Sequence, residues 1–405
     1  MNFRRIACVL SAVPLAFYAY ACSSSDSGGG GNDGGSSGTS GSSGTSGSSG
    51  SSGTSGTSGT SGTSGTSGDA GKDAADGSVP IVCIGNPLLA SPDAGTPDGG
   101  ATADAAATSQ IVPGGVGVGS LFLDGPQWVD GVGANPGFLV YSEFQPTESL
   151  RRVAADGGAN SVFRTAGFSP TLAPVGNAGL RNGFLLTAAT GTGTPSLIFQ
   201  TAVDGGVGPT IPIGTAGSPN DLIVGKGGSI YFTDPQYQLV VPSLIPKGAY
   251  ATAADGGSPT RFTTFANPND EPNGIELSPD GTKLYISFTN LNDPATRRVD
   301  SYPVAANGTV TPTATTVIPA ALLTDLPDGL AVDVGGNIYV AEAAAANAIG
   351  GRVGVFTPAG KYLGEIPFPT ERPTNLTFGG ADKKTLFITV ENGIYVYKGR
   401  CAGLP

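Results

Sequence analysis

The sequence predicts an all-β fold, a six-bladed β-propeller, from two markers that repeat along the chain and from the strand pattern between them. One marker is an extended segment that ends in a Gly-containing turn, such as Ala155-Asp156-Gly157, and it recurs about every 50 residues. The other marker is a proline ahead of an apolar segment, with a similar spacing, at Pro126, Pro174, Pro219, Pro272, Pro327 and Pro373. Repeats of this length that contain several short strands are typical of propeller blades, so six prolines predict six blades.

Each repeat contains short apolar runs joined by Gly-Gly or Asp-Gly turns. In the fourth repeat, residues 275–277 and 284–287 flank such a turn, and in the fifth, residues 330–332 and 338–340 do so. These pairs predict β-hairpins. Residues 111–122 are expected to add a strand to the last blade and close the ring, which removes exposed sheet edges. Residues 90–109, rich in Ala, Asp, Gly and Pro, are expected to form a surface loop.

Residues 1–21 predict a secretory signal peptide. Arg4 and Arg5 precede an apolar stretch that is too short for a stable membrane span, and small residues come before Cys22. The position of Cys22 directly after Ala21 resembles the lipobox of bacterial lipoproteins. That resemblance implies a lipidated Cys22 and a lipid-anchored protein of the cell envelope, with the outer membrane favoured because Ser23 follows. Ordinary cleavage without lipidation is the alternative.

The remaining chain divides into residues 22–80, a flexible tether, and residues 81–405, the propeller. Residues 36–68 repeat Ser/Thr-Ser-Gly triplets, which cannot bury apolar surface and so remain disordered. Cys83 and Cys401 lie near opposite ends of the propeller segment. In an oxidising compartment they are expected to form a structural disulfide.

Composition removes several classes of function. The chain has no histidine, which excludes a Ser-His-Asp triad and His-based zinc sites. Its four cysteines form no Cys-x-x-Cys pair, so iron–sulfur and structural zinc sites are excluded too. A net charge of −11 disfavours nucleic acid as a partner. We expect a monomer that contacts the membrane only through its lipid anchor.

The proline markers also predict a metal site. Residues in the same phase of each blade converge on the central channel, and Asn220, Asn273 and Asp328 each follow a marker proline. Asp124 lies two residues before the first marker proline. Two carboxylates and two amides suit a hard divalent cation, and calcium is the expected ion. Pro-Asn-Gly and Pro-Asp-Gly are also common turn tripeptides, so a purely structural role is the alternative for each residue.

The same segments resemble the SMP-30/gluconolactonase family. The resemblance rests on Ser218-Pro219-Asn220-Asp221-Leu222, Glu271-Pro272-Asn273-Gly274-Ile275, Leu326-Pro327-Asp328-Gly329-Leu330 and Arg372-Pro373-Thr374-Asn375-Leu376. It implies a six-bladed propeller with one divalent metal, often calcium, and a lactone or ester as the small-molecule substrate. By position, it implies metal ligands at Asp124, Asn220, Asn273 and Asp328, with Asp328 also the base or the nucleophile.

Two departures from the family bear on function. The first blade has Asp124 where the family usually has Glu, and the second blade lacks the His that many lactonases carry. Asp221 and Asp234 are expected to support the ligands or contact substrate, or else to be buried turn or strand-end residues. We therefore expect an envelope-anchored, metal-dependent lactone or ester hydrolase. The alternative is a non-catalytic propeller that binds a sugar, a peptide or a protein partner.

Overall fold

The structure, a computed structural model, describes Leu88, residues 101–102 and 108–112, and residues 122–404 apart from gaps at 132–135, 146, 170–171, 192–196, 214–216, 237–244, 266 and 346–347. The predicted signal peptide and tether lie outside these residues, as do Cys22 and Cys83. In the part of the chain that is described, no helix is both long and apolar enough to cross a bilayer.

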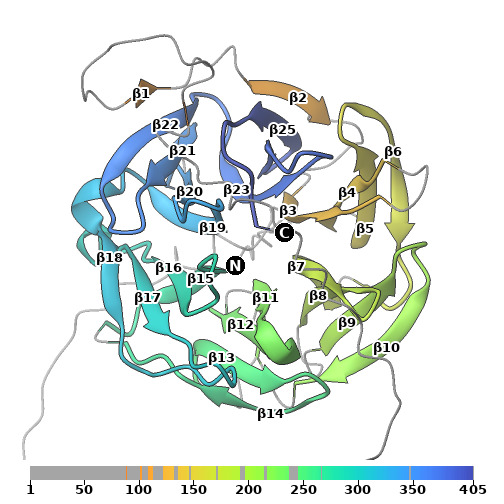
Figure 1. Cartoon of the computed structure of the whole chain (residues 1–405), viewed down its shortest axis with the longest axis horizontal. Helices are drawn as coiled ribbons and strands as arrows, with labels where there is room; N and C mark the ends of the chain where they lie inside the picture. The colour runs from red at the N-terminus through yellow and green to blue at the C-terminus, as the bar shows by residue number, and fades with distance from the viewer. Residues whose placement is uncertain are drawn as a thin grey trace, which may run out of the picture. The chain divides into compact units, whose positions relative to one another are not determined.

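Six β-sheets stand around one axis, which confirms the predicted propeller (Figure 1). In the first three blades the strands follow one another from the axis outward. Blade one contains β3 (Phe122–Val129), β4 (Phe138–Gln145), β5 (Ser149–Ala154) and β6 (Gly157–Arg164). Blade two contains β7 (Leu172–Arg181), β8 (Phe184–Gly191), β9 (Leu197–Ala202) and β10 (Val207–Pro212). Blade three contains β11 (Leu222–Val224), β12 (Ile230–Asp234), β13 (Gly248–Ala253) and β14 (Gly256–Arg261).

The last three blades have the same plan. Blade four contains β15 (Glu271–Leu277), β16 (Lys283–Thr289), β17 (Arg298–Pro303) and β18 (Thr315–Pro319). Blade five contains β19 (Leu326–Val332), β20 (Ile338–Ala343), β21 (Gly351–Phe356) and β22 (Tyr362–Phe368). Blade six contains β23 (Pro373–Gly379), β24 (Thr385–Val390) and β25 (Gly393–Lys398). Among the described residues, short 3₁₀-helices span Lys226–Gly228, Pro294–Thr296 and Ala320–Leu322.

The segment before blade one closes the ring, but it begins earlier than the sequence suggested. β2 (Thr108–Val112) pairs antiparallel with β25 and supplies the outer strand of blade six. β1 (Ala101–Thr102) pairs parallel with β22 as a fifth strand on blade five. The prediction of a surface loop over residues 90–109 is therefore wrong at 101–102 and 108–109. Its Thr and Ser residues there pair with outer blade edges, which would otherwise remain open.

The repeated Gly turns lie at one place in the blades, between the third and fourth strands. Gly157, Gly205, Gly256, Gly308 and Gly360 all have φ between 79° and 91°. These left-handed conformations are ones that glycine adopts without strain, which explains the period of the first sequence marker. The proline marker lies just before the inner strand or within its first three residues in blades two to six, and Pro126 lies in the middle of β3. In blades two to six the two markers therefore lie at opposite ends of the blade.

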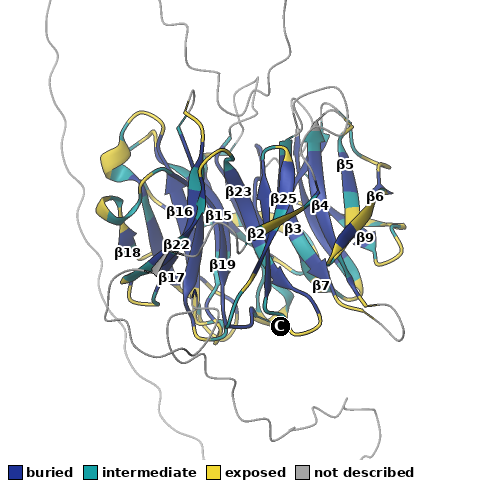
Figure 2. Ribbon diagram, turned by 90° about the horizontal axis from the view of Figure 1, so that it is seen from above, coloured by how far each residue is buried: buried dark blue, intermediate teal, exposed yellow. Residues whose placement is uncertain are grey.

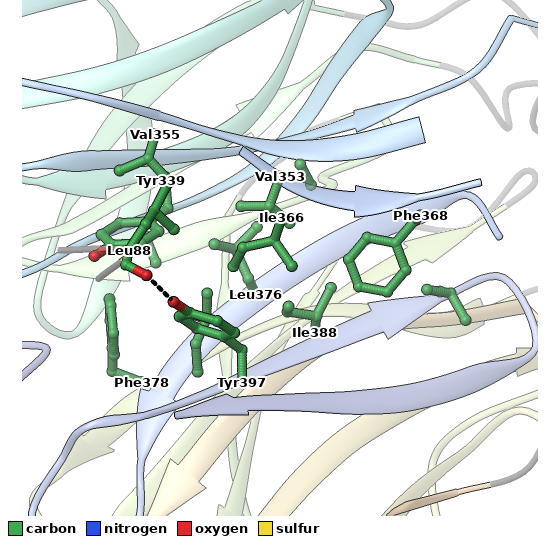
Figure 3. Packing of buried hydrophobic residues seen from close by; sticks show 14 residues of the cluster. Leu88, Tyr339, Val353, Val355, Ile366, Phe368, Leu376, Phe378, Ile388 and Tyr397 are labelled. Carbon is green, nitrogen blue, oxygen red and sulfur yellow. Dashed lines mark hydrogen bonds between the residues drawn. The ribbon is translucent and has the colours of Figure 1, made fainter. Parts of the chain in front are cut away.

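Apolar side chains fill the space between neighbouring blades. Figure 3 shows the cluster between blades five and six, where Val353 and Ile366 face Leu376 and Ile388. The hydroxyl of Tyr397 donates to Leu88 O at 2.8 Å in the same cluster. Figure 2 shows buried residues along the inner parts of the blades and exposed residues in the outer strands and loops. Burial between blades fixes each inner strand beside the axis.

Candidate functional site

The predicted ligands of blades three, four and five occupy equivalent positions beside the axis. Asn273 and Asp328 each follow the proline of β15 or β19, at a bulge where the pairing with the second strand shifts. Asn220 comes two residues before β11, and its N–H donates to Thr233 O at 2.8 Å. All three side chains are buried, with exposed fractions of 8% for Asn220, 3% for Asn273 and 8% for Asp328. The structure therefore brings these three predicted residues to one level of the channel wall.

Asp124 comes from a different register position than the sequence suggested. In blade one Asp124 pairs with Ser142 and Gln127 with Val140, just as in blade five Pro327 pairs with Glu342 and Leu330 with Val340. Asp124 thus takes the place of a marker proline, and Pro126 lies two residues later than its counterparts. The carboxyl is nevertheless buried beside the axis, 5% exposed, where it interacts electrostatically with Asp221 and Asp328.

Close approach of the inner strands explains the glycines in these motifs. A Cβ on Gly274 would lie 2.5 Å from Asp328 O, and one on Gly329 would lie 2.1 Å from Asn375 Oδ1. Neither glycine has a positive φ, and both lie within strands. The interpretation of Pro-Asn-Gly and Pro-Asp-Gly as turns is therefore wrong in these two blades. Glycine is needed because the neighbouring blade passes so near.

Hydroxyl groups fix the backbone of the predicted ligands from the preceding blade. Thr233 Oγ1 donates to Asn273 O at 2.6 Å, and Ser287 Oγ donates to Asp328 O at 2.6 Å. Thr289 Oγ1 donates to Pro327 O at 2.5 Å. These hydroxyls lie on the second strands β12 and β16, so blade three holds the inner strand of blade four and blade four holds that of blade five. The arrangement preorganises the site without using its side-chain oxygens.

Three buried carboxyl groups beside the axis interact with one another electrostatically. Burial raises the pKa of Asp124 to about 6, while the N–H of Gly125 and the amide of Asn375 lower it. Burial and repulsion from Asp124 raise the pKa of Asp221 to about 7. Burial raises the pKa of Asp328 well above its usual range, with further repulsion from Asp124 and Asp221. A cation among these groups would relieve both causes.

Asn375, from blade six, is a site residue that the sequence analysis missed. Its amide hydrogen-bonds to both Asp124 and Asp221, while its Oδ1 accepts the N–H of Leu376 at 2.8 Å. Asn375 and Asp221 are each the second residue after a marker proline, so the same repeat phase could have identified the pair. Asn375 positions two carboxyl groups that would otherwise only repel each other.

The positive charge that acts on Asp328 comes from Arg372, just before β23. Arg372 Nη1 also bonds to Glu391 Oε1 at 2.7 Å, and Glu391 in turn repels Asp328. One guanidinium shared in this way compensates the carboxyl cluster only in part.

Asp221 and Asp234 support the predicted ligands in different ways. Asp221 accepts the N–H of Leu222 at 2.9 Å and that of Ile275 at 3.3 Å, which ties blade three to blade four. Asp234 ends β12 and accepts the N–H groups of Gly217 and Ser218, just ahead of Asn220. Burial raises the pKa of Asp234 to about 6. Asp234 is thus a buried strand-end residue that holds the segment leading to Asn220.

The donor set fits a hard divalent cation better than a soft one. Within the described residues, no three His, Cys, Asp or Glu side chains gather as a metal-binding group by themselves. The predicted set instead combines two carboxylates with two amide oxygens, all of them buried, and hard oxygen donors of this kind suit calcium. Cys401, away from the site, is buried and disulfide-bonded; its predicted pairing with Cys83 stays a prediction.

Comparisons with known proteins agree with this architecture. The family model "SMP-30/Gluconolactonase/LRE-like region" matches residues 134–392, which include Asn220, Asn273 and Asp328 but not Asp124. A gluconolactonase of Zymomonas mobilis is 28% identical over 298 residues, which are 67% of this chain and 76% of that protein. The structure of a gluconolactonase from Xanthomonas campestris has 25% identity and a TM-score of 0.56, covering 72% of this chain and 89% of that one. The calcium-binding protein regucalcin of Agrobacterium tumefaciens shares the fold, with 18% identity and a TM-score of 0.52 over 70% of this chain and 93% of its own.

Proposed function

Because the chain belongs to the SMP-30/gluconolactonase/LRE-like family, we propose that it is a lactonase that hydrolyses small sugar lactones at a calcium ion beside the channel axis. The observation that carries the proposal is the mutual repulsion of three buried carboxyl groups, Asp124, Asp221 and Asp328. A cation bound beside these groups would relieve their repulsion, which favours a hydrolase that uses one. The relatives named gluconolactonases supply the substrate class.

Asp124, Asn220, Asn273 and Asp328 would hold the calcium ion. A bound calcium ion supplies a Lewis acid that polarises the lactone carbonyl. Asp124 and Asp328 supply the charge that sets the affinity, since calcium affinity follows the number of charged ligands. Asn220 and Asn273 complete the site as neutral oxygen donors, with their main chains fixed by hydrogen bonds within blade three and from β12.

Asp328 is the general base in this proposal. Its carboxylate takes a proton from a water molecule while the water oxygen bonds to the lactone carbonyl carbon. The ring C–O bond then breaks, and the departing ring oxygen takes the proton back from Asp328. The product is the open hydroxy acid. Asp328 suits this role because its main chain is fixed through Ser287 while its side-chain oxygens accept no hydrogen bond from the described residues.

A lactone panel tests the proposal. Purified protein should open five- and six-membered sugar lactones in calcium, and chelation should abolish the activity reversibly. Asp328→Asn should lose turnover, whereas Asp280→Asn should retain it. Asp280 lies in the same Pro-Asp-Gly context but in an exposed hairpin turn, where it accepts the hydroxyl of Ser278 at 2.6 Å. Equal activity in both variants would contradict the assignment.

The absence of histidine favours a second candidate function. A propeller without the imidazole that many lactonases carry could bind a sugar or peptide at the same mouth without turning it over. The two functions separate in one experiment. If calcium and lactones raise the melting temperature while no lactone or ester in the panel is hydrolysed, the result supports the binding function and contradicts the catalytic one.

We further propose that Cys22 is lipidated and anchors the protein to the cell envelope, with the outer membrane favoured. Support comes from the signal-like residues 1–21 and the repetitive tether that follows. Metabolic labelling with palmitate should tag the wild-type chain and leave Cys22→Ser unlabelled. Persistent labelling of Cys22→Ser would refute the anchor.

A further inference from the structure

A cavity lies towards the opposite end of the inner strands from the proposed calcium site. It has a volume of about 350 Å³, and residues of all six inner strands line it. The wall residues the argument uses are Gln127, Gly179, Val224, Glu276, Thr377 and Leu404. Leu404 belongs to the C-terminal segment, where Gly403 N donates to Lys383 O at 2.9 Å.

This cavity is separate from the proposed catalytic centre. Glu276 comes three residues after Asn273 on β15, and Gln127 comes three residues after Asp124 on β3. Three residues of extended strand span about 10 Å. The two sites therefore use the same strands at different depths.

Glu276 provides the unusual chemistry of this cavity. Its Oε1 accepts the N–H of Leu277 at 2.7 Å, and none of the ion pairs among the described residues includes it. The other charged groups on the wall, Lys383 and Asp130, bond to each other at 2.5 Å. Burial and, less strongly, repulsion from Asp221 raise the pKa of Glu276 to about 8. The cavity thus presents a carboxyl group that no described cation neutralises.

The other residues of the cavity wall suit an organic cation better than a metal ion. Calcium takes six to eight oxygen ligands, whereas Glu276 is the one wall carboxyl outside an ion pair among the described residues. The volume is also far greater than an ion fills. Val224 and Leu404 offer apolar surface, and the side-chain oxygens of Gln127 and Thr377 offer neutral acceptors on the wall of the same cavity. An ammonium donates three hydrogen bonds and matches this combination when it carries a short apolar stem.

We propose that this cavity binds a small primary amine, with its ammonium on Glu276 and its apolar stem against Val224 and Leu404. The proposal does not depend on lactone hydrolysis, because the cavity shares no residue with the proposed calcium site.

The probe for this site is n-butylamine, with 1-butanol as the uncharged match of similar size. Calorimetric titration into the calcium-loaded protein should detect the amine and not the alcohol. Glu276→Gln should weaken amine binding at least tenfold, since a hydrogen bond between charged groups is lost. Gly179→Leu should also abolish binding by filling the cavity, because a Cβ at Gly179 meets only Gln127 Nε2, at 3.6 Å.

Two controls keep the result interpretable. Both variants should retain the calcium-induced rise in melting temperature, which shows that they fold, and Asp328→Asn should bind the amine as wild type does. Equal binding of amine and alcohol, or undiminished amine binding by Glu276→Gln, would overturn the proposal. So would an absence of amine binding by the folded wild-type protein at millimolar concentration.

Discussion

Replacing Asp124 by Asn should stabilise the calcium-free protein. Burial raises the pKa of Asp124 from 3.8 to about 6 in the folded state. A carboxyl whose pKa is raised on folding favours the folded state when it is protonated. This contribution to the free energy of unfolding is lost as the pH rises through the folded pKa. This difference between the folded and unfolded pKa corresponds to about 3 kcal/mol at pH 8. Asn has nearly the same shape as Asp and carries no charge, so it removes this unfavourable free energy of the ionised carboxyl.

Denaturant unfolding in a chelator measures the effect. At pH 8 the free energy of unfolding of Asp124→Asn should exceed that of wild type by about 1–3 kcal/mol, and the gain should shrink as the pH falls towards 4. In saturating calcium the order should reverse, because the variant loses a charged ligand. Asp280→Asn is the matched control, for which we expect the opposite change in the free energy of unfolding. The hydroxyl of Ser278 and the N–H and hydroxyl of Thr282 lower the pKa of Asp280 to about 2, so its loss should destabilise the protein modestly with or without calcium.

The reasoning fails if Asp124→Asn unfolds more readily than wild type in chelator at pH 8. That result would mean that the Asp124 carboxylate is already compensated without a cation. It would remove the electrostatic argument for the calcium site.

Three further results are expected from the same structure. Calcium-free wild type should melt at a higher temperature at pH 5 than at pH 8, because folding raises the pKa values of Asp124, Asp221 and Asp234. Added calcium should abolish or reverse this trend, and a melting temperature that falls towards pH 5 in chelator would contradict the prediction. Gly329→Ala should lower the free energy of unfolding by about 1–3 kcal/mol, because its Cβ would lie 2.1 Å from Asn375 Oδ1. Gly179→Ala, whose Cβ has its nearest contact at 3.6 Å, should change it little, and equal urea midpoints for the two variants would refute the close-approach argument. Non-reducing peptide mapping should find Cys401 joined to Cys83, and a different partner would exclude the predicted pairing.

The blades were predictable because each carries its own local signals. A turn glycine at positive φ and a proline near the start of the inner strand are properties of one short segment, so their repetition is visible without a structure. The same locality caused the phase error in blade one. Pro126 looks like the other markers, yet strand pairing places Asp124 at the position of those prolines.

Features that depend on neighbouring blades were not predictable from single motifs. Asn375 acts on Asp124 and Asp221, which lie in two other blades, and only closure of the ring brings the three together. Gly274 and Gly329 looked like turn residues, since the carbonyl and amide groups that exclude a Cβ belong to the next blade. The role proposed for Glu276 was not predictable from the sequence, because it depends on a cavity that residues from all six blades line.

The most direct test of the central claim is the calcium dependence of lactone hydrolysis in wild type, Asp328→Asn and Asp280→Asn, measured beside calcium binding in the same preparations. We predict calcium-dependent turnover in wild type and Asp280→Asn, and loss of turnover with weakened calcium binding in Asp328→Asn. Calcium binding and turnover that are unchanged in Asp328→Asn would contradict a catalytic calcium site at the channel mouth.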